Sequence, residues 1–199
     1  MEHLQQVLFD GQGKRKYLTA KERDAFIGAA ELASPEIRTF CMVLAQTGCR
    51  ISEALDLTPD RIDFDAGVII FETLKKRRKG LFRAVPVRFE VLDALDLVHQ
   101  VRRSQSMEKH RNKPLWTWAR NTGWRHVKTV MNKAGVVGPH ASPKGLRHAF
   151  GILTTQDGVP INKVQKWLGH SRMETTAIYL DALGDEERAY MEKFWKNNR

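Results

Sequence analysis

Three stretches of the sequence carry side chains suited to breaking a phosphoester bond: TGCRISEAL with Arg50, PKGLRHAFG with Arg147, and LGHSRMETTAIYL with His170 and Tyr179. A tyrosine hydroxyl can attack phosphorus and keep the energy of the phosphoester in a covalent link. Two arginines can hold the non-bridging oxygens bidentately and stay charged at any working pH. A histidine can hold an oxygen or assist the loss of the tyrosine proton. These residue types fit transfer of a phosphoryl group to a tyrosine.

Taken singly, each of these residues also has an ordinary structural explanation. Tyr179 in TTAIYL can be a packing residue of a helix, and His170 after Leu-Gly can lie in a loop or cap. Arg50 can be a surface arginine just past a helix end, and Arg147 can simply pair with an acidic neighbour. Their joint occurrence in one order and spacing is what favours a functional site.

The order and spacing of the three stretches resemble the catalytic domain of the tyrosine recombinases, also called the phage integrase family. The resemblance covers nearly the whole chain, from about Thr19 to Asp181. It rests on TGxRxSE, on LRH followed by F, and on LGH nine residues before a tyrosine. It implies site-specific DNA recombination, in which a strand of double-stranded DNA is cut through a 3′-phosphotyrosyl intermediate and rejoined without any cofactor or metal ion.

The resemblance also implies a role for each matching residue. Arg50 and Arg147 match the two family arginines, and His170 matches the later His/Trp position. Tyr179 matches the nucleophile. Two arginines aimed at the phosphate would stabilise the charge of the transition state, which is usually the largest share of rate enhancement.

The basic turn KKRRKG supplies the expected proton donor. In the resembling family a hairpin lysine protonates the leaving 5′-oxygen, and Lys75 at the end of IIFETLK matches it. Lys76 is one residue away and stays an alternative, and the whole turn can instead be a basic loop that attracts phosphates. Lys76 and Arg77 are therefore also assigned to DNA binding.

One position departs from the family pattern. The family usually has H-x-x-R at the second arginine, whereas this chain has Lys144 three residues before Arg147. An unperturbed lysine is protonated at neutral pH, so Lys144 can donate to a phosphate oxygen but is a poor general base. If Tyr179 needs a base, His170 or solvent is expected to serve. His148 matches a common family residue, and we assign it a structural role.

The stretch WARNTGWRHVK alternates aromatic and basic residues at the start of a predicted helix. Its polar and basic side chains can contact phosphates or base edges in a major groove: Arg120, Thr122, Arg125 and Lys128. In the resembling family this helix faces DNA. The alternative is a helix with Trp124 and Val127 in the core and a basic face exposed to solvent.

The composition agrees with a polyanionic partner. The 33 basic and 23 acidic residues give a net charge of +10, although a basic protein with a solvated positive face also fits. Cys41 and Cys49 lie in an apolar helical stretch and are predicted to be buried thiols of a reducing compartment. Because neither a signal peptide nor a membrane-spanning run is recognisable, we expect a cytoplasmic, nucleoid-associated protein of bacterial type and no membrane partner.

The elements that must position these residues are mainly helical. Helices are predicted at about 19–32, 34–47, 51–57, 90–103, 121–134, 146–156, 162–168, 174–180 and 185–195. GVIIFETLK and FRAVPV predict an antiparallel hairpin, and LWTW is compatible with a short strand. The fold class is therefore α+β, mainly α, with a small antiparallel sheet, as in the tyrosine recombinase catalytic domain.

Three segments are expected: a flexible basic segment at 1–18, the catalytic domain at 19–183 and a tail helix at 184–199. The N-terminal DNA-clamping domain of the family is expected to be absent, so an accessory protein is a possible replacement for it. The tail helix either packs on its own domain or docks onto the next protomer of a dimer or tetramer on DNA.

Two other functions stay open. A type IB topoisomerase has the same chemistry but rejoins the same strand. A DNA-binding regulator, or an integrase relic that is catalytically silent, would keep the fold alone, and Lys144 together with the expected absence of the clamping domain favours that alternative.

Overall fold

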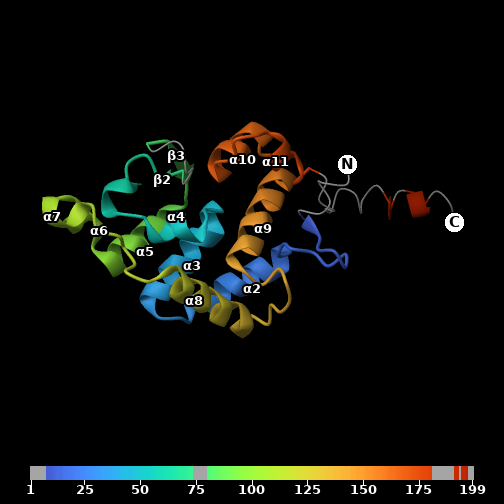
Figure 1. Cartoon of the computed structure of the whole chain (residues 1–199), viewed down its shortest axis with the longest axis horizontal. Coiled ribbons are helices and arrows are strands. Elements are labelled where there is room, and N and C mark those ends of the chain that lie inside the picture. The colour runs from blue at the N-terminus through green and yellow to red at the C-terminus, as the bar shows by residue number, and fades with distance from the viewer. Residues whose placement is uncertain (1–7, 74–79, 181–190, 193, 197–199) are drawn as a thin grey trace.

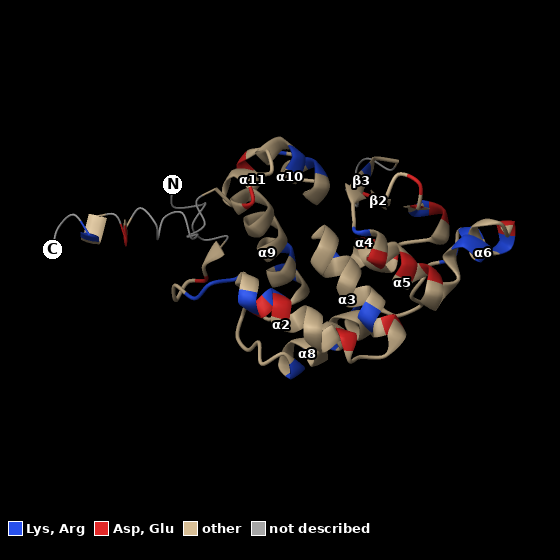
Figure 2. Ribbon diagram, turned by 180° about the vertical axis from the view of Figure 1, so that it is seen from behind, with Lys and Arg blue, Asp and Glu red and all other residues tan. Residues whose placement is uncertain are grey.

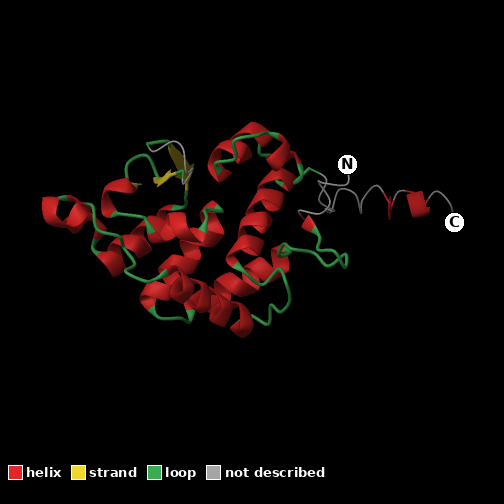
Figure 3. Ribbon diagram, in the orientation of Figure 1, coloured by secondary structure: helices red, strands yellow, loops and turns green. Residues whose placement is uncertain are grey.

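The computed structural model describes residues 8–73, 80–180, 191–192 and 194–196. Helices form most of the body, and one small sheet lies at its edge (Figures 1 and 3). The structure thus confirms the predicted fold class. Among the described residues, no helix is long and apolar enough to cross a membrane.

The first two helices begin and end largely as the sequence predicts. α2 (Ala20–Glu31) starts at a capping box, in which Thr19 and Glu22 satisfy each other's backbone amides. α3 (Pro35–Thr47) starts at a proline and ends at Gly48, whose φ of 60° is left-handed. Ser34 lies at the N-cap of α3, but its side chain makes no capping hydrogen bond.

The chain turns at Gly48 and immediately starts α4 (Ile51–Leu55). Arg50 lies at the N-cap of this helix, so its position is fixed by the turn that ends α3. The helix ends at Leu55, two residues before the predicted end at 57, and Pro59 starts the 3₁₀ helix η1 (Pro59–Arg61).

The predicted hairpin is present and is joined by a strand that the sequence did not predict. The three antiparallel strands β1 (Ile62–Asp63), β2 (Val68–Glu72) and β3 (Phe82–Pro86) lie in the order β1-β2-β3. In the β2–β3 register, Ile70 faces Ala84 and Phe71 faces Arg83. The alternating residues Ile69, Phe71 and Val85 are buried.

The middle of the chain differs from the prediction in three places. The expected helix at 90–103 is two helices, α5 (Phe89–His99) and α6 (Val101–Gln105), because Gln100 adopts a left-handed φ of 50°. The predicted loop that follows contains the short α7 (Glu108–Arg111). LWTW is not a strand: Trp116 is buried and its indole donates to the carbonyl of Glu36 at 3.0 Å.

The last helices are α8 (Arg120–Lys133), α9 (Pro143–Gln156), α10 (Ile161–Leu168) and α11 (Glu174–Ala177). α9 starts earlier than predicted because Ser142 caps it by accepting from the amide of Gly145 at 3.1 Å. α11 is shorter than predicted and ends two residues before Tyr179. Of the predicted tail helix, only residues 191–192 and 194–196 are described, and they are helical.

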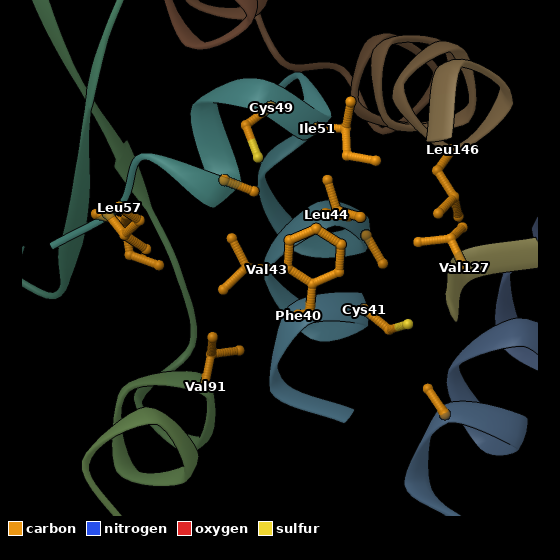
Figure 4. Close-up of a cluster of buried hydrophobic side chains, with 14 of the residues drawn as sticks. Phe40, Cys41, Val43, Leu44, Cys49, Ile51, Leu57, Val91, Val127 and Leu146 are labelled. Carbon is orange, nitrogen blue, oxygen red and sulfur yellow. The ribbon is translucent and has the colours of Figure 1, made fainter. Parts of the chain in front are cut away.

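The core is built around α3. Phe40, Val43 and Leu44 of this helix are buried among side chains from α5, α8 and α9 (Figure 4). Phe40 meets the rings of Trp116 and Trp118 edge to face, at 5.1 and 5.5 Å between centroids. Replacing such a residue by alanine typically costs about 3–5 kcal/mol. The core therefore fixes α3, whose end leads to Arg50, and α9, which carries Arg147.

The two cysteines belong to this core, as predicted. Both are free, and burial raises the pKa of the Cys41 and Cys49 thiols to about 12. At neutral pH they are protonated apolar groups that contribute to packing and have no nucleophilic thiolate.

Candidate active site

Residues far apart in the sequence line one cleft of about 530 Å³. Arg50 starts α4, Lys144 and Arg147 lie in α9, and His170 and Tyr179 follow α10 and α11 (Figure 1). The structure thus brings together the residues that the sequence singled out in three separate stretches. Arg120 and Trp124 of α8 close another side of the cleft.

The described lining of this cleft is basic. Four cations face it, Arg50, Arg120, Lys144 and Arg147, and no Asp or Glu is among the described lining residues. Figure 2 shows that acidic residues gather instead on α2 and α5. A cleft with several cations and no carboxylate focuses positive potential and attracts an anion such as a phosphodiester.

Arg147 is held rigidly at the centre of the site. It is 8% exposed, and its Nη1 and Nη2 donate to the carbonyls of Gly48 at 2.8 Å and Leu168 at 2.6 Å. Burial, and then the nearby charge of Arg50, lowers its pKa to about 10, so it stays charged at neutral pH. The guanidinium is thereby fixed in orientation before any ligand arrives.

Arg50 is held by a buried acidic residue that our sequence analysis did not single out. Its Nη1 lies 2.9 Å from Oε1 of Glu53, which also accepts from the Arg50 backbone amide at 2.8 Å through Oε2. Because 44% of the Arg50 side chain is exposed, its charge is available to the cleft. Glu53 therefore orients Arg50 without lining the cleft itself.

Arg83 of β3 completes this network and was also missed. Its Nη2 lies 2.6 Å from Oε2 of Glu53, and its Nε donates to the carbonyl of Trp167 at 2.7 Å. The pair is buried, and although burial alone raises the pKa of Glu53, Arg83 brings it below its ordinary value. A signal was present in FRAVPV, where a charged residue shares the buried face of the strand with Val85.

His170 lies at the turn after α10, where Gly169 has a left-handed φ of 66°. Its Nδ1 and the hydroxyl of Thr176 are 2.9 Å apart, which joins the turn to α11. Burial, followed by the charges of Arg147 and Arg50, lowers the pKa of His170 to about 3. At neutral pH it is an uncharged imidazole.

Tyr179 packs its ring against His170 and faces His148. The rings of His170 and Tyr179 are stacked at 6.2 Å, and the Tyr179 hydroxyl lies 3.2 Å from Nδ1 of His148. Gly151 of α9 leaves room for the ring, since a Cβ at that position would lie 2.4 Å from Cε2 of Tyr179. Burial raises the pKa of Tyr179 to about 12, against the opposing effect of Arg147 and Arg50.

Lys144 occupies the first turn of α9, is exposed and lines the cleft. His148, one turn later on the same helix, is buried and is the histidine that meets Tyr179. Lys75, Lys76 and Arg77 lie outside the described residues.

The four DNA-binding candidates on α8 differ in their surroundings. Arg120 and Arg125 are exposed, and only Arg120 lines the cleft. Thr122 is partly buried beside Arg125, at 3.4 Å between Oγ1 and Nη2. Lys128 is partly buried and donates to the carbonyl of Ala141 at 2.8 Å. Val127 is in the core as the alternative expected, but Trp124 is 42% exposed and therefore is not a core residue.

Comparison with known proteins gives the family. The sequence profile of the Phage integrase family matches residues 16–185. The chain belongs to the phage integrase family. In this integrase-family chain, the four residues that match the family motifs all line the cleft: Arg50, Arg147, His170 and Tyr179.

Relatives of this integrase-family chain are recombinases and a regulatory protein. The tyrosine recombinase XerA of Thermococcus kodakarensis is 29% identical over 89% of this chain and 62% of its own length. The type 1 fimbriae regulatory protein FimE of Escherichia coli K12 is 28% identical over 83% of this chain and 85% of its own. The chain thus spans less than two thirds of the XerA sequence.

Solved structures agree on the fold. A crystal structure of XerA recombinase superposes with a TM-score of 0.71 at 26% identity, over 92% of this chain and 65% of that one. XerH recombinase, bound to palindromic difH substrate in a post-cleavage complex, gives a TM-score of 0.76 at 20% identity, over 91% and 53% of the two chains. Both likenesses cover more than nine tenths of this chain.

Within the described residues, no group of three or more His, Cys, Asp or Glu side chains is placed to hold a metal ion.

Proposed function

We propose that this chain cuts and rejoins double-stranded DNA as a site-specific tyrosine recombinase. The observation that carries the proposal is the convergence of Arg50, Arg147, His170 and Tyr179 on one basic cleft. A tyrosine surrounded by fixed cations is suited to attack a phosphodiester that those cations hold. The family membership and the recombinase relatives support the same conclusion.

In this mechanism Oη of Tyr179 attacks the phosphorus, forming a 3′-phosphotyrosyl link and releasing a 5′-hydroxyl. Arg50 and Arg147 hold the non-bridging oxygens, on which negative charge grows in the transition state. Because Arg147 is already fixed by two carbonyls, it needs little reorganisation during the reaction. In the reverse direction, the 5′-hydroxyl of another strand attacks the link, and strands are exchanged.

Two further cleft residues complete the contacts to the phosphate. His170, uncharged at neutral pH, donates a hydrogen bond from a ring N–H to a phosphate oxygen while Thr176 fixes its ring. Lys144 donates to another oxygen. Protonation of the leaving 5′-oxygen is assigned to Lys75, with Lys76 as the alternative.

DNA beyond the reacting phosphate is expected to lie across α8. Arg120 and Arg125 are exposed cations on that helix, and Thr122 and Lys128 lie beside them. Lys76 and Arg77 would add contacts from the hairpin. Because phosphate contacts dominate affinity, substitution of Arg120 or Arg125 should weaken binding and reduce its dependence on salt.

Recombination needs several protomers on paired sites, so we propose self-association on DNA through the C-terminal helix. Met191, Phe194 and Trp195 of that segment are 45, 58 and 50% exposed, which leaves apolar area for another surface. An accessory protein that supplies a DNA clamp is the other partner proposed.

The test is covalent capture. Nicked duplexes from DNA flanking the gene lose a short fragment after cleavage, so an active chain accumulates as an SDS-resistant adduct. We expect an adduct in the presence of EDTA, and none with Tyr179→Phe, which keeps the ring. DNA binding without an adduct would contradict the recombinase function and favour the silent regulator. Relaxation of any supercoiled plasmid, without a specific site, would instead favour a topoisomerase.

A further inference from the structure

His148 contacts the hydroxyl group of Tyr179, the nucleophile of the proposed function. Its Nδ1 lies 3.2 Å from Oη of Tyr179, and the two rings meet at 62° with 5.9 Å between centroids. Both side chains are buried, at 5% and 2% exposure, and both reach the cleft. The contact comes from the interior of α9, so the imidazole is positioned by the helix that also carries Arg147.

The hydrogen-bond network assigns the direction of this contact. Within the described residues, Nε2 of His148 is buried and has no partner. With the proton on Nε2, Nδ1 accepts from the Tyr179 hydroxyl, and one buried donor is unsatisfied. With the proton on Nδ1, that nitrogen donates to Oη, and both the phenolic proton and the Nε2 lone pair lack a protein partner. Unsatisfied buried polar atoms are costly, so the first arrangement is favoured and Tyr179 donates.

The surroundings keep His148 uncharged before DNA binds. Burial first, and then the charges of Lys144, Arg147 and Lys16, lowers its pKa to about 4. Among the described residues, the other titratable groups that face it are His170 and Tyr179. A bound phosphodiester brings negative charge beside Lys144 and Arg147, and this charge favours protonation of the imidazole at the moment of reaction.

Lys144 cannot act as the acceptor of the Tyr179 proton. A protonated amine has three donors and no acceptor, so it can hold a phosphate oxygen but cannot accept the phenolic proton. His170 already uses Nδ1 for Thr176, whereas the hydroxyl of Tyr179 meets His148.

We propose that His148 is a catalytic residue whose Nδ1 accepts the proton of Tyr179 as Oη attacks phosphorus. This inference rests on the proposed function and replaces the structural role assigned from sequence. The O–P bond to Tyr179 forms, the bond from phosphorus to the 5′-oxygen breaks, and the phenolic proton moves to Nδ1. The leaving oxygen takes its proton from a separate donor, assigned to the hairpin lysine. On rejoining, the imidazolium returns its proton to the departing phenolate.

The first test needs no DNA. In the whole chain labelled with ¹⁵N-histidine, long-range ¹H–¹⁵N spectra at pH 7 report which ring nitrogen carries hydrogen, and His148→Asn identifies the signal. We expect a protonated Nε2 and an unprotonated Nδ1 at His148. A proton on Nδ1 would overturn the proposal.

The second test varies the acidity of the nucleophile. Fluorotyrosine at position 179 has a lower phenol pKa and depends less on a base. We expect His148→Leu to slow single-turnover adduct formation by about 10²-fold or more, and fluorotyrosine to recover at least tenfold of that loss. His148→Asn can accept a hydrogen bond but cannot take the proton. Its adduct formation should therefore also be slow, and fluorotyrosine should also restore part of the rate.

The matched control is His140→Asn, which alters another buried histidine whose ring contacts Glu22 instead of Tyr179. It should change stability without changing the response to fluorotyrosine. Full activity of His148→Leu or His148→Asn would contradict the role of His148 but not the proposed function. The same holds if fluorotyrosine changes the rate equally in the parent, the His148 variants and the control. An unchanged chain that binds its site yet forms no adduct would overturn the proposed function and this inference together.

Discussion

Nη1 of Arg147 donates a 2.8 Å hydrogen bond to the carbonyl of Gly48, two residues before Arg50. This bond joins α9 to the turn between α3 and α4 across 99 residues of sequence. A second bond, to the carbonyl of Leu168, joins the same guanidinium to the turn that carries His170. One side chain therefore connects the three stretches whose residues line the cleft.

Arg147→Lys tests this arrangement, because lysine keeps the charge but lacks the planar fork. We expect single-turnover adduct formation to fall by about 10²–10³-fold, the usual effect of losing one preorganised donor. DNA affinity, measured by fluorescence anisotropy, should fall much less. Lys21→Gln removes an exposed cation on α2 as a control and should leave the rate unchanged. A rate for Arg147→Lys near that of the parent would contradict the role of the fork.

The buried pair of Glu53 and Arg83 predicts a large effect on stability. Glu53→Gln leaves Arg83, whose side chain is 4% exposed, without its counter-charge. Losing one partner of a buried ion pair typically costs about 3–5 kcal/mol. Urea unfolding should show this loss, while the exposed Glu31→Gln should stay within about 0.5 kcal/mol of the parent. A small effect of Glu53→Gln would mean that Arg83 does not depend on this carboxylate.

Much of the fold, and the candidate residues that line the cleft, followed from the sequence, because short local motifs indicate them. Thr19 and Glu22 cap α2 through residues within one turn, and Gly48 ends α3 by its own conformational freedom. The hairpin followed from two short apolar stretches on either side of a basic turn. Each of these features is decided within a few residues of chain.

The features that were missed depend on contacts between distant segments. The exception is Gln100, a local break in a helix that the apolar periodicity predicts to be continuous, and its amide still donates to the carbonyl of Asp96. Arg83 of β3 meets Glu53 of α4 across 30 residues and packs beside α10, and the contact of His148 with Tyr179 spans 31 residues. Composition and periodicity do not encode such pairings, so they became visible only in three dimensions.

At acid pH, the free energy of unfolding should depend on the charge of Glu22. Arg15 binds its carboxylate through both Nη atoms, and that pairing, opposed by burial, lowers the pKa from 4.5 to about 2. Because the folded pKa is the lower one, this stabilisation is complete above pH 4.5 and is lost as the pH falls toward 2.

Glu22→Gln keeps a capping side chain at the third helical position but removes the charge. We expect it to cost about 1–2 kcal/mol at pH 7 and almost nothing near pH 2, as measured by urea unfolding across that range. If the parent and the variant lose stability in parallel between pH 4.5 and 2, the ion pair with Arg15 is not the cause.

The lack of a side chain at Gly151 allows α9 to approach the ring of Tyr179 closely. A Cβ at this position would lie 2.4 Å from Cε2 and 2.6 Å from Cζ of Tyr179, so Gly151→Ala forces the ring to move. We expect a loss of about 1–3 kcal/mol in stability, as for other overpacked interiors, and a drop of more than tenfold in adduct formation.

Gly28→Ala is the matched control, because Gly28 also lies inside a helix and has nothing within 4 Å of the added Cβ. That change should raise stability by about 0.5–1 kcal/mol and leave the adduct unchanged. Thermal unfolding and covalent capture of both variants check the prediction, and equal behaviour of the two alanines would show that Tyr179 is not held where the structure places it.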